Sequence, residues 1–213
     1  MNYILLFACL SSATIFFPLF LTIPKRGVLW EQHKFLCYFL INHIVSEIVN
    51  ASLALNKIRN LEAMLFFSLI EGVLLLLLYR SVIEEIPLKR FLKFLTPAYV
   101  LGYIGVYFFL DYKLYIPSYT YPFHQIVMLV TVILFFADRM RRMNEIFLTE
   151  NPMFWISCGF LFFYTGSIFY FALHNTLFAD YPSISKNGWL IHSTMLVIMN
   201  LFLAIGIFKI RKA

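Results

Sequence analysis

Long apolar stretches recur along the chain, separated by short segments that hold charged and turn-forming residues. A helix must have about 20 mainly apolar residues to cross a bilayer whose hydrocarbon core is about 30 Å thick. The stretches are continuously apolar instead of alternating between apolar and polar positions, so they predict helices and exclude a transmembrane β-barrel. The pattern predicts seven membrane-spanning helices, at residues 3–22, 35–54, 63–79, 94–110, 122–137, 152–173 and 189–208.

The composition agrees with this pattern. Of the 213 residues, 62% are hydrophobic and 13% are charged, whereas about a quarter of the residues in a soluble domain are charged. Seven helices of about 20 residues leave only short connections in a chain of this length. We therefore expect a single all-α transmembrane domain over residues 1–213, with no fused soluble catalytic domain and no enzyme activity.

The distribution of lysine and arginine predicts the orientation. Thirteen of the 17 follow the first, third or fifth predicted helix or lie at the C-terminus. Cytoplasmic connections are enriched in these residues, so we expect a multi-pass protein of the cytoplasmic (inner) membrane with its N-terminus outside and its C-terminus in the cytoplasm. The net charge of +6 then reflects contact with the lipid bilayer and its anionic headgroups, and no nucleic-acid partner is indicated.

Tyrosine is concentrated around the end of the fourth predicted helix. Tyr99, Tyr103 and Tyr107 recur every four residues, which predicts a stripe that packs against a neighbouring helix with its hydroxyls hydrogen-bonded. The outer connection that follows is rich in tyrosine, and such residues often form an aromatic belt at the membrane surface. The predicted belt consists of Tyr112, Tyr115, Tyr119 and Tyr121.

Polar side chains interrupt several of the predicted helices. His43, Glu47 and Asn50 follow a spacing of four and three residues, which places them on one face of the second helix. Ionisable groups are costly to place against lipid, so this face must contact protein or water. With residues of the third, sixth and seventh helices they make up the predicted ligand-binding set: His43, Glu47, Asn50, Glu71, Thr165, Ser167, His192 and Asn200.

The depth of these groups follows from the rise of about 1.5 Å per helical residue. Three layers result, which pair His43 with Asn200, Glu47 with Glu71, and Asn50 with His192. If the second, third and seventh helices are neighbours, the layers form a polar core that opens toward the outer half of the membrane. The sixth helix, and His124 at the outer end of the fifth, would complete its walls.

Two interpretations of this polar core are open at this point. The groups can form a structural network of hydrogen bonds that holds the helices together, with about 1 kcal/mol from each bond. They can equally form a pocket that binds a ligand, because ionisable residues inside a membrane often mark functional sites.

Metal and cofactor chemistry has less support. Haem held by two histidines needs both at one depth, which excludes His43 with His192 and leaves His124 with His192. A membrane zinc hydrolase is not indicated, because the sequence has no H-x-x-x-H pair and its three cysteines are isolated. Lys209 lies too near the end of the last helix to hold retinal. We predict no metal and no cofactor. The aspartates are expected in connections: Asp111, Asp138 and Asp180.

Three stretches, residues 59–83, 151–175 and 189–209, carry recognisable motifs. The stretches resemble a family of small seven-helix membrane proteins from Bacteroidetes-type bacteria. The resemblance implies that the recurrent family features in this chain are Glu71, Asn151, Pro152, Phe154, Trp155, Gly159, Gly166, Ser167, His192 and Asn200. That family is similar to the membrane sensor halves of seven-helix histidine kinases, so the resemblance implies a seven-helix fold and signalling through a separate partner.

The leading hypothesis is a non-enzymatic membrane sensor or signalling accessory module. A small apolar or weakly polar ligand, or a partner helix, would enter a pocket between the second, third, sixth and seventh helices. A separate soluble or membrane signalling partner would respond at the cytoplasmic side, and the chain could also form a homo-oligomer. The alternative hypothesis is a small-solute or proton-coupled carrier that uses Glu47 and Glu71, and a redox protein is the third.

Overall fold

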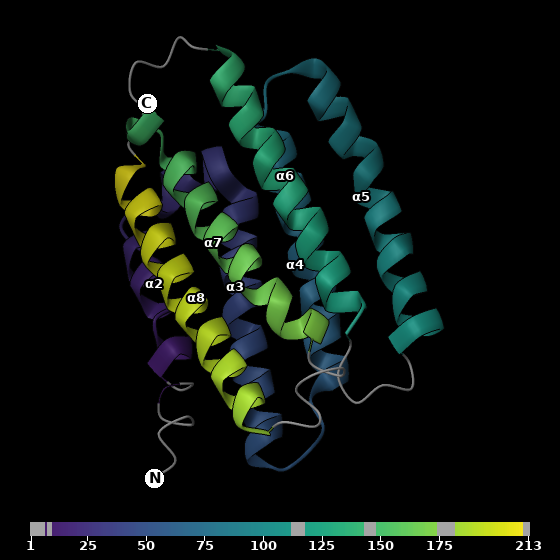
Figure 1. Ribbon diagram of the computed structural model, residues 1–213. Helices are drawn as coiled ribbons and strands as arrows, with labels where there is room; N and C mark the ends of the chain where they lie inside the picture. Colours follow the sequence, from purple (N-terminus) through teal and green to yellow (C-terminus); the bar gives the residue numbers. More distant parts are fainter. Residues whose placement is uncertain (1–6, 8–9, 112–117, 143–147, 174–181, 211–213) are drawn as a thin grey trace.

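The computed structural model of the chain describes residues 7, 10–111, 118–142, 148–173 and 182–210 (Figure 1). These residues fold into helices and contain no β-strand. A π-helical turn at Tyr107–Asp111 follows α5, and a 3-10 turn at Leu148–Glu150 precedes α7. The helices are α2 (Phe16–Thr22), α3 (Arg26–Leu55), α4 (Leu61–Val82), α5 (Ile86–Val106), α6 (Thr120–Arg142), α7 (Pro152–Leu173) and α8 (Pro182–Lys209).

Six of these helices, α3 to α8, are long and apolar enough to cross a membrane. The prediction of an all-α chain is confirmed for the described residues, and six of the seven predicted membrane-spanning helices have the required length and apolar character. The first predicted helix, residues 3–22, falls partly outside the described residues. Within them it is an apolar segment at Leu10–Thr22, and at about 1.5 Å per residue this segment is shorter than the bilayer core.

The helices extend beyond the apolar stretches from which they were predicted. α3 begins at Arg26 instead of residue 35, and α6 continues to Arg142 instead of ending at residue 137. Hydropathy marks the residues that suit a hydrocarbon environment, whereas backbone hydrogen bonding continues through charged residues whose side chains reach water. In α6 the charged end therefore continues the helix of the apolar stretch. In α3 the residues before the apolar stretch are set off by a kink at His33, whose φ of −137° and ψ of 43° are not helical.

The helices run alternately up and down (Figure 1). From left to right in that view, α2 packs on α8, α8 on α7, α7 on α6, and α6 on α5. α3 and α4 pack against each other behind this row, and α4 also contacts α5 and α6. The assumed adjacency of the second and third predicted helices, now α3 and α4, is therefore correct, while α8 packs mainly against α7 and α2.

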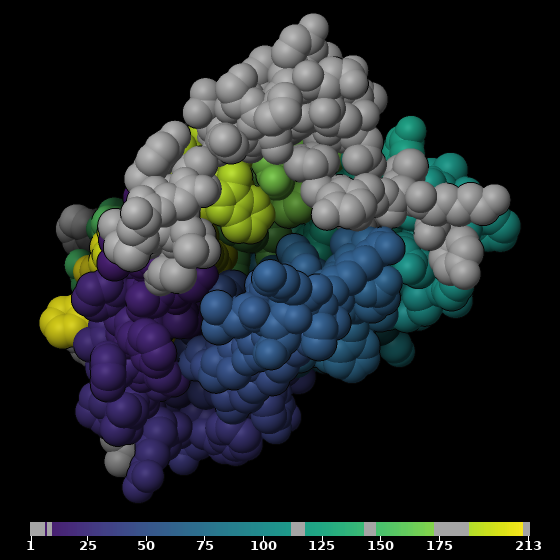
Figure 2. Space-filling view, turned by 90° about the horizontal axis from the view of Figure 1, so that it is seen from below, coloured from purple at the N-terminus to yellow at the C-terminus, as the bar shows by residue number. Residues whose placement is uncertain are grey.

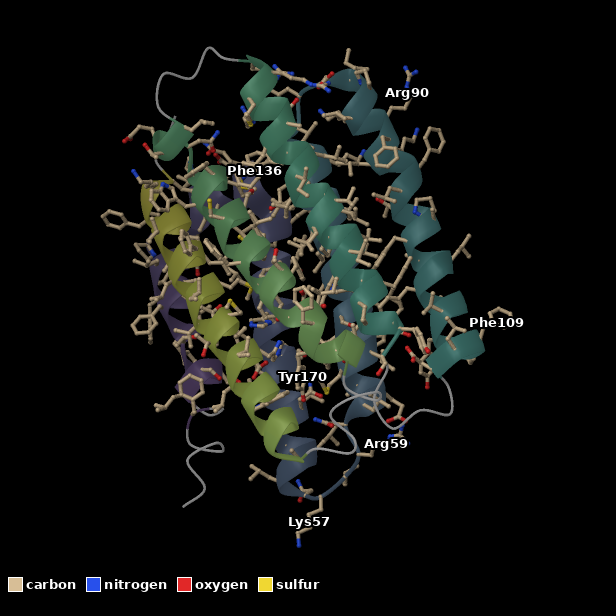
Figure 3. All side chains as sticks on the ribbon, in the orientation of Figure 1. Lys57, Arg59, Arg90, Phe109, Phe136 and Tyr170 are labelled. Carbon is tan, nitrogen blue, oxygen red and sulfur yellow. The ribbon has the colours of Figure 1, made fainter. Side chains whose placement is uncertain are left out.

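The two ends of the bundle differ in charge. Lys57 and Arg59 lie at one end, here called the Lys57 end, and Arg90 lies at the opposite Arg90 end (Figure 3). Because the helices alternate in direction, the described basic residues that were assigned to the cytoplasm gather in the half nearer the Arg90 end. They are Lys25, Arg26, Lys34, Arg80, Lys89, Arg90, Lys93, Arg139, Arg141, Arg142 and Lys209.

A buried aspartate ties α6 to the beginning of α5. Asp138 lies near the C-terminal end of α6, where it accepts backbone hydrogen bonds from Glu84 at 3.4 Å and Glu85 at 2.9 Å. Arg142 pairs with Asp138 at 3.4 Å and with Glu84 at 2.7 Å. A carboxylate at a helix N-terminus satisfies N–H groups that have no partner within the helix. Asp138 therefore fixes the α4–α5 turn against α6.

A second aspartate caps the N-terminus of α6 in the same way. Asp111, in the π-helical turn, is buried and accepts backbone hydrogen bonds from Tyr119 at 3.1 Å and Thr120 at 2.5 Å. The prediction that the aspartates lie in connections is wrong for Asp111 and Asp138, because both belong to helical turns that cap a neighbouring helix. Asp180 lies outside the described residues.

Glycine allows α7 and α8 to pack closely. A Cβ atom at Gly159 would lie 3.0 Å from the carbonyl oxygen of Met199, and one at Gly166 would collide with the side chain of Met195. Gly159 and Gly166 therefore permit the close approach of α8 to α7. Apolar side chains such as Phe109, which is 88% exposed, face outward (Figure 3).

Candidate functional site

A cavity of about 130 Å³ lies between α3, α4, α6, α7 and α8, in the half of the bundle nearer the Lys57 end. Figure 2, which views the bundle from that end, shows a hollow between the blue surface of α3 and α4 and the yellow-green and green atoms of α8 and α7. The apolar lining consists of Met64, Phe163, Phe171 and Leu196. The polar lining consists of His43, Ser46, Glu47, Asn50, Ser68, Glu71, Tyr121, His124, Gln125, Tyr164 and His192.

Glu71 of α4 is the central carboxylate of this cavity. The hydroxyl of Tyr164, on α7, donates a hydrogen bond of 2.8 Å to Glu71 Oε1. His124 Nε2, on α6, lies 3.8 Å from the same oxygen. The Glu71 side chain is only 17% exposed. A buried carboxylate is stable only when such donors or cations compensate for its lost hydration, so three helices meet at this one group.

His124 is held in place from its other side. Its Nδ1 atom shares a hydrogen bond of 2.8 Å with the hydroxyl of Tyr99, on α5. A Cβ atom at Gly72 would collide with the Tyr99 ring, so the tyrosine reaches this position only because residue 72 has no side chain. Tyr103 continues the stripe and donates to the Leu65 carbonyl at 3.0 Å. The prediction that this stripe packs with satisfied hydroxyls is confirmed for Tyr99 and Tyr103.

His192 of α8 sits among aromatic rings. Its Nδ1 atom shares a hydrogen bond of 2.8 Å with Ser167 Oγ on α7. The rings of Phe163, Phe171 and Trp189 lie 5.3–5.4 Å from the imidazole, centroid to centroid. Ser167 is completely buried and does not line the cavity. The serine therefore orients the imidazole and has no access to a bound molecule as a nucleophile.

Four polar atoms around the cavity are buried without a hydrogen-bond partner among the described residues. They are His43 Nε2, Asn50 Oδ1, Tyr121 Oη and Gln125 Oε1. A buried polar atom without a partner costs about 1–3 kcal/mol. Buried polar groups in native proteins are nearly always satisfied by protein, water or ligand. The four atoms belong to residues that line one cavity, so a small rearrangement of these side chains would let water or a ligand complete their hydrogen bonds there.

Most of the predicted site residues lie together at the cavity. His43, Glu47, Asn50, Glu71 and His192 all line the cavity, and Ser167 supports His192 from behind. The polar face predicted for the second helix is therefore real, and it faces the interior of the bundle from α3.

Two predicted site residues lie elsewhere. Thr165 is exposed, because it follows Tyr164 by 100° around α7 and so turns away from the cavity. Asn200 is buried but does not line the cavity. Its Nδ2 atom donates to Thr14 Oγ1 at 2.8 Å, which ties α8 to the segment that precedes α2. The predicted layer of His43 and Asn200 is therefore not formed, because α8 packs against the N-terminal segment at the depth of Asn200.

Several lining residues were not expected. Tyr121 was assigned to an outer aromatic belt, but it is buried and its ring stacks on Phe171 at 4.5 Å. Of the other belt residues, Tyr119 is exposed, and Tyr112 and Tyr115 lie outside the described residues. Tyr164 was also missed, because an aromatic residue within an apolar stretch does not interrupt its hydropathy. His124 and Gln125 form an adjacent polar pair in the sequence, but only His124 was considered as a possible site residue.

Aromatic side chains close the cavity on the side toward the Arg90 end. Phe39 lies one turn from His43 on α3, and Phe160 lies one turn from Tyr164 on α7. Their rings meet edge to face at 5.1 Å, and Tyr79 packs against Phe160 at 6.5 Å. All three are 0–1% exposed. We call Phe39, Tyr79, Phe160 and the neighbouring Phe135 the aromatic plug.

The charge of the lining is one-sided. Glu47 and Glu71 both contribute carboxylates, whereas no lysine or arginine lines the cavity. Within the described part of the chain Glu47 forms no hydrogen bond or ion pair, and no group of three metal-ligating side chains is found. The site therefore offers hydrogen-bonding groups and negative charge, in a setting formed partly by aromatic rings.

Comparison with family models, curated proteins and solved structures finds no match to this chain.

Proposed function

We propose that the chain is a non-enzymatic, multi-pass protein of the cytoplasmic membrane that binds a small ligand in the polar cavity and signals through a separate partner. In this proposal the N-terminus lies outside and the C-terminus in the cytoplasm, in agreement with the basic Arg90 end. The cavity then belongs to the outer half of the membrane. The observation that carries the proposal is that four buried polar atoms, unpartnered among the described residues, belong to side chains that line one cavity.

A route from the cavity to the cytoplasmic side supports a signalling role. α4 carries Glu71, and α6 carries His124, which lies 3.8 Å away across the helix interface. At their other ends α4 and α6 meet again, where Arg139 of α6 donates a hydrogen bond of 2.9 Å to the carbonyl oxygen of Val82, the last residue of α4. Beside this contact, Arg141 of α6 pairs with Glu85 of the α4–α5 turn at 3.0 Å. A ligand that shifts α4 relative to α6 would rearrange these contacts. A soluble or membrane partner that binds this charged surface would respond to the shift.

The proposed role also agrees with the resemblance to the membrane sensor halves of seven-helix histidine kinases. In those proteins the sensor is the membrane part of a kinase, whereas here the responding protein would be a separate chain. Identification of a soluble protein that co-purifies from native membranes would name this partner.

The proposal is tested by thermal unfolding of the purified protein in detergent with three four-carbon probes: n-butylammonium, n-butanol and butyrate. We expect at least one probe to raise the midpoint of wild-type protein and of Glu62→Gln, and to have no effect on Glu71→Gln. Glu62 is a matched control, because it lies on the same helix but is 63% exposed beside Arg59. Lower stability in Glu71→Gln and His192→Ala, with no probe effect in wild type, would instead identify a structural network.

A carrier is the second candidate, favoured by the two carboxylates that line a cavity within the membrane-spanning helices. It requires access from both faces, whereas the aromatic plug closes the Arg90 side. Proton flux into sealed vesicles is the test. A carrier would be established if the flux exceeds that of empty vesicles and is lowered by Glu47→Gln and by Glu71→Gln. A flux equal to that of empty vesicles would reject it.

Haem binding is the weakest candidate. His124 and His192 both line the cavity, as that hypothesis requires. However, a volume of about 130 Å³ resembles that of a cavity of about 150 Å³ that holds benzene, and a porphyrin is far larger. A visible absorption spectrum of the purified protein without a haem band would reject it.

A further inference from the structure

We propose that the cavity selects a small organic cation, of the class of a primary alkylammonium. This inference rests on the proposed ligand-binding function and specifies the chemistry of the ligand. It follows from the charge of the lining, from the kind of hydrogen-bonding atom left without a partner, and from the aromatic and apolar walls.

The charge of the lining favours a cation over an anion. Glu47 and Glu71 are the carboxylates of the cavity wall, which also holds His43, His124 and His192 but neither lysine nor arginine. Glu71 receives a hydrogen bond from Tyr164 and has His124 nearby at 3.8 Å. Glu47 has no partner within the described part of the chain. A carboxylate or phosphate ligand would add negative charge to this setting, whereas an ammonium would compensate it.

The unpartnered atoms favour a ligand with several donors. Asn50 Oδ1 and Gln125 Oε1 are carbonyl oxygens, which only accept hydrogen bonds. Tyr121 Oη can accept as well as donate. A primary ammonium has three donors and no acceptor, so it matches these oxygens together with a carboxylate. A neutral hydrocarbon would leave all of them without partners.

The remaining walls suit the alkyl part of such a cation. The rings of Tyr121 and Phe171 stack at 4.5 Å beside the cavity, and aromatic faces attract ammonium groups within about 6 Å. Met64 and Leu196 supply aliphatic surface. The volume of about 130 Å³ is close to that of a cavity of about 150 Å³ that holds benzene. An unbranched amine of four carbons fits this volume.

The test is isothermal titration of the purified full-length protein in detergent with n-butylammonium, n-butanol and butyrate, which share one carbon skeleton and differ in charge. We expect n-butylammonium to bind most tightly, butanol about tenfold or more weakly, and butyrate not at all. This comparison uses wild-type protein only, so it does not depend on the folding of any variant.

Two variants then locate the site. Glu47→Gln and Glu71→Gln should each weaken n-butylammonium about tenfold or more, while the exposed control Glu62→Gln should bind it as wild type does. If butanol or butyrate binds at least as tightly as n-butylammonium, the cationic class is wrong although a ligand site exists. If none of the three probes binds, the cation proposal and the proposed ligand site both fail.

Discussion

Tyr164 of α7 donates a hydrogen bond of 2.8 Å to Glu71 of α4. This contact brings a carboxylate from the third predicted helix together with a tyrosine from the sixth, and His124 approaches the same oxygen from α6. The cavity is assembled around these three side chains, so removing one of them should affect both stability and binding.

Tyr164→Phe should lower the free energy of unfolding by about 1–3 kcal/mol, because Glu71 loses a hydrogen bond while it stays buried. Thermal unfolding in detergent measures the change. Tyr119→Phe is the control, since Tyr119 is exposed and the loss of its hydroxyl should change stability by less than about 0.5 kcal/mol. Equal effects of the two substitutions would show that the Tyr164 bond contributes nothing specific.

Gly72→Ala should destabilise the protein by about 1–3 kcal/mol, because the new Cβ atom would collide with the Tyr99 ring that holds His124. Gly105→Ala is the matched control in a neighbouring helix. A Cβ atom at Gly105 meets nothing within 4 Å, and alanine favours a helix over glycine by about 1 kcal/mol. A Gly72→Ala protein as stable as Gly105→Ala would contradict the described position of Tyr99.

Asp138→Asn should destabilise the turn between α4 and α5 by about 1–2 kcal/mol, since a charged acceptor of the Glu85 N–H at 2.9 Å becomes neutral. Glu150→Gln is the control. Glu150 is 67% exposed and pairs with Lys209 at 3.6 Å, an arrangement that contributes little in proteins. Unfolding midpoints of the two variants give the comparison, and a smaller loss for Asp138→Asn than for Glu150→Gln would overturn this assignment.

Thiol accessibility should differ on the two sides of the aromatic plug. In a protein whose Cys9, Cys37 and Cys158 are replaced by alanine, Asn50→Cys should react with a small methanethiosulfonate added outside sealed vesicles, because residue 50 lines the cavity. Ser157→Cys should not react, since Ser157 is fully buried beneath the plug. Reaction of Ser157→Cys would mean that the plug opens, as a carrier requires.

Much of this arrangement could be predicted from the sequence. Apolar length gives the helices, and the spacing of His43, Glu47 and Asn50 gives the inward face of α3, because each follows from helical geometry alone. The positions of Asn200 and Thr165 could not be predicted in the same way. Depth does not determine which neighbour a helix faces, and α8 faces the Thr14 segment where Asn200 lies.

The tyrosines show a second reason why the site could not be predicted fully from the sequence. Tyr121 and Tyr164 do not interrupt the apolar stretches, yet both side chains line the cavity. Whether a tyrosine lies at a membrane surface or in a polar interior depends on tertiary packing, here the stacking of Tyr121 on Phe171. Two of the eleven polar residues that line the cavity are therefore missed by a search for polar positions in apolar stretches.

The central claim is that the unpartnered polar atoms serve a ligand and do not hold the fold together. Tyr121→Phe tests it most directly, because the substitution removes an unpartnered hydroxyl and keeps the stacked ring. We predict a free energy of unfolding equal to or above that of wild type, measured in detergent without ligand, together with weaker binding of n-butylammonium. A loss of stability greater than about 1 kcal/mol, with binding unchanged, would contradict the claim.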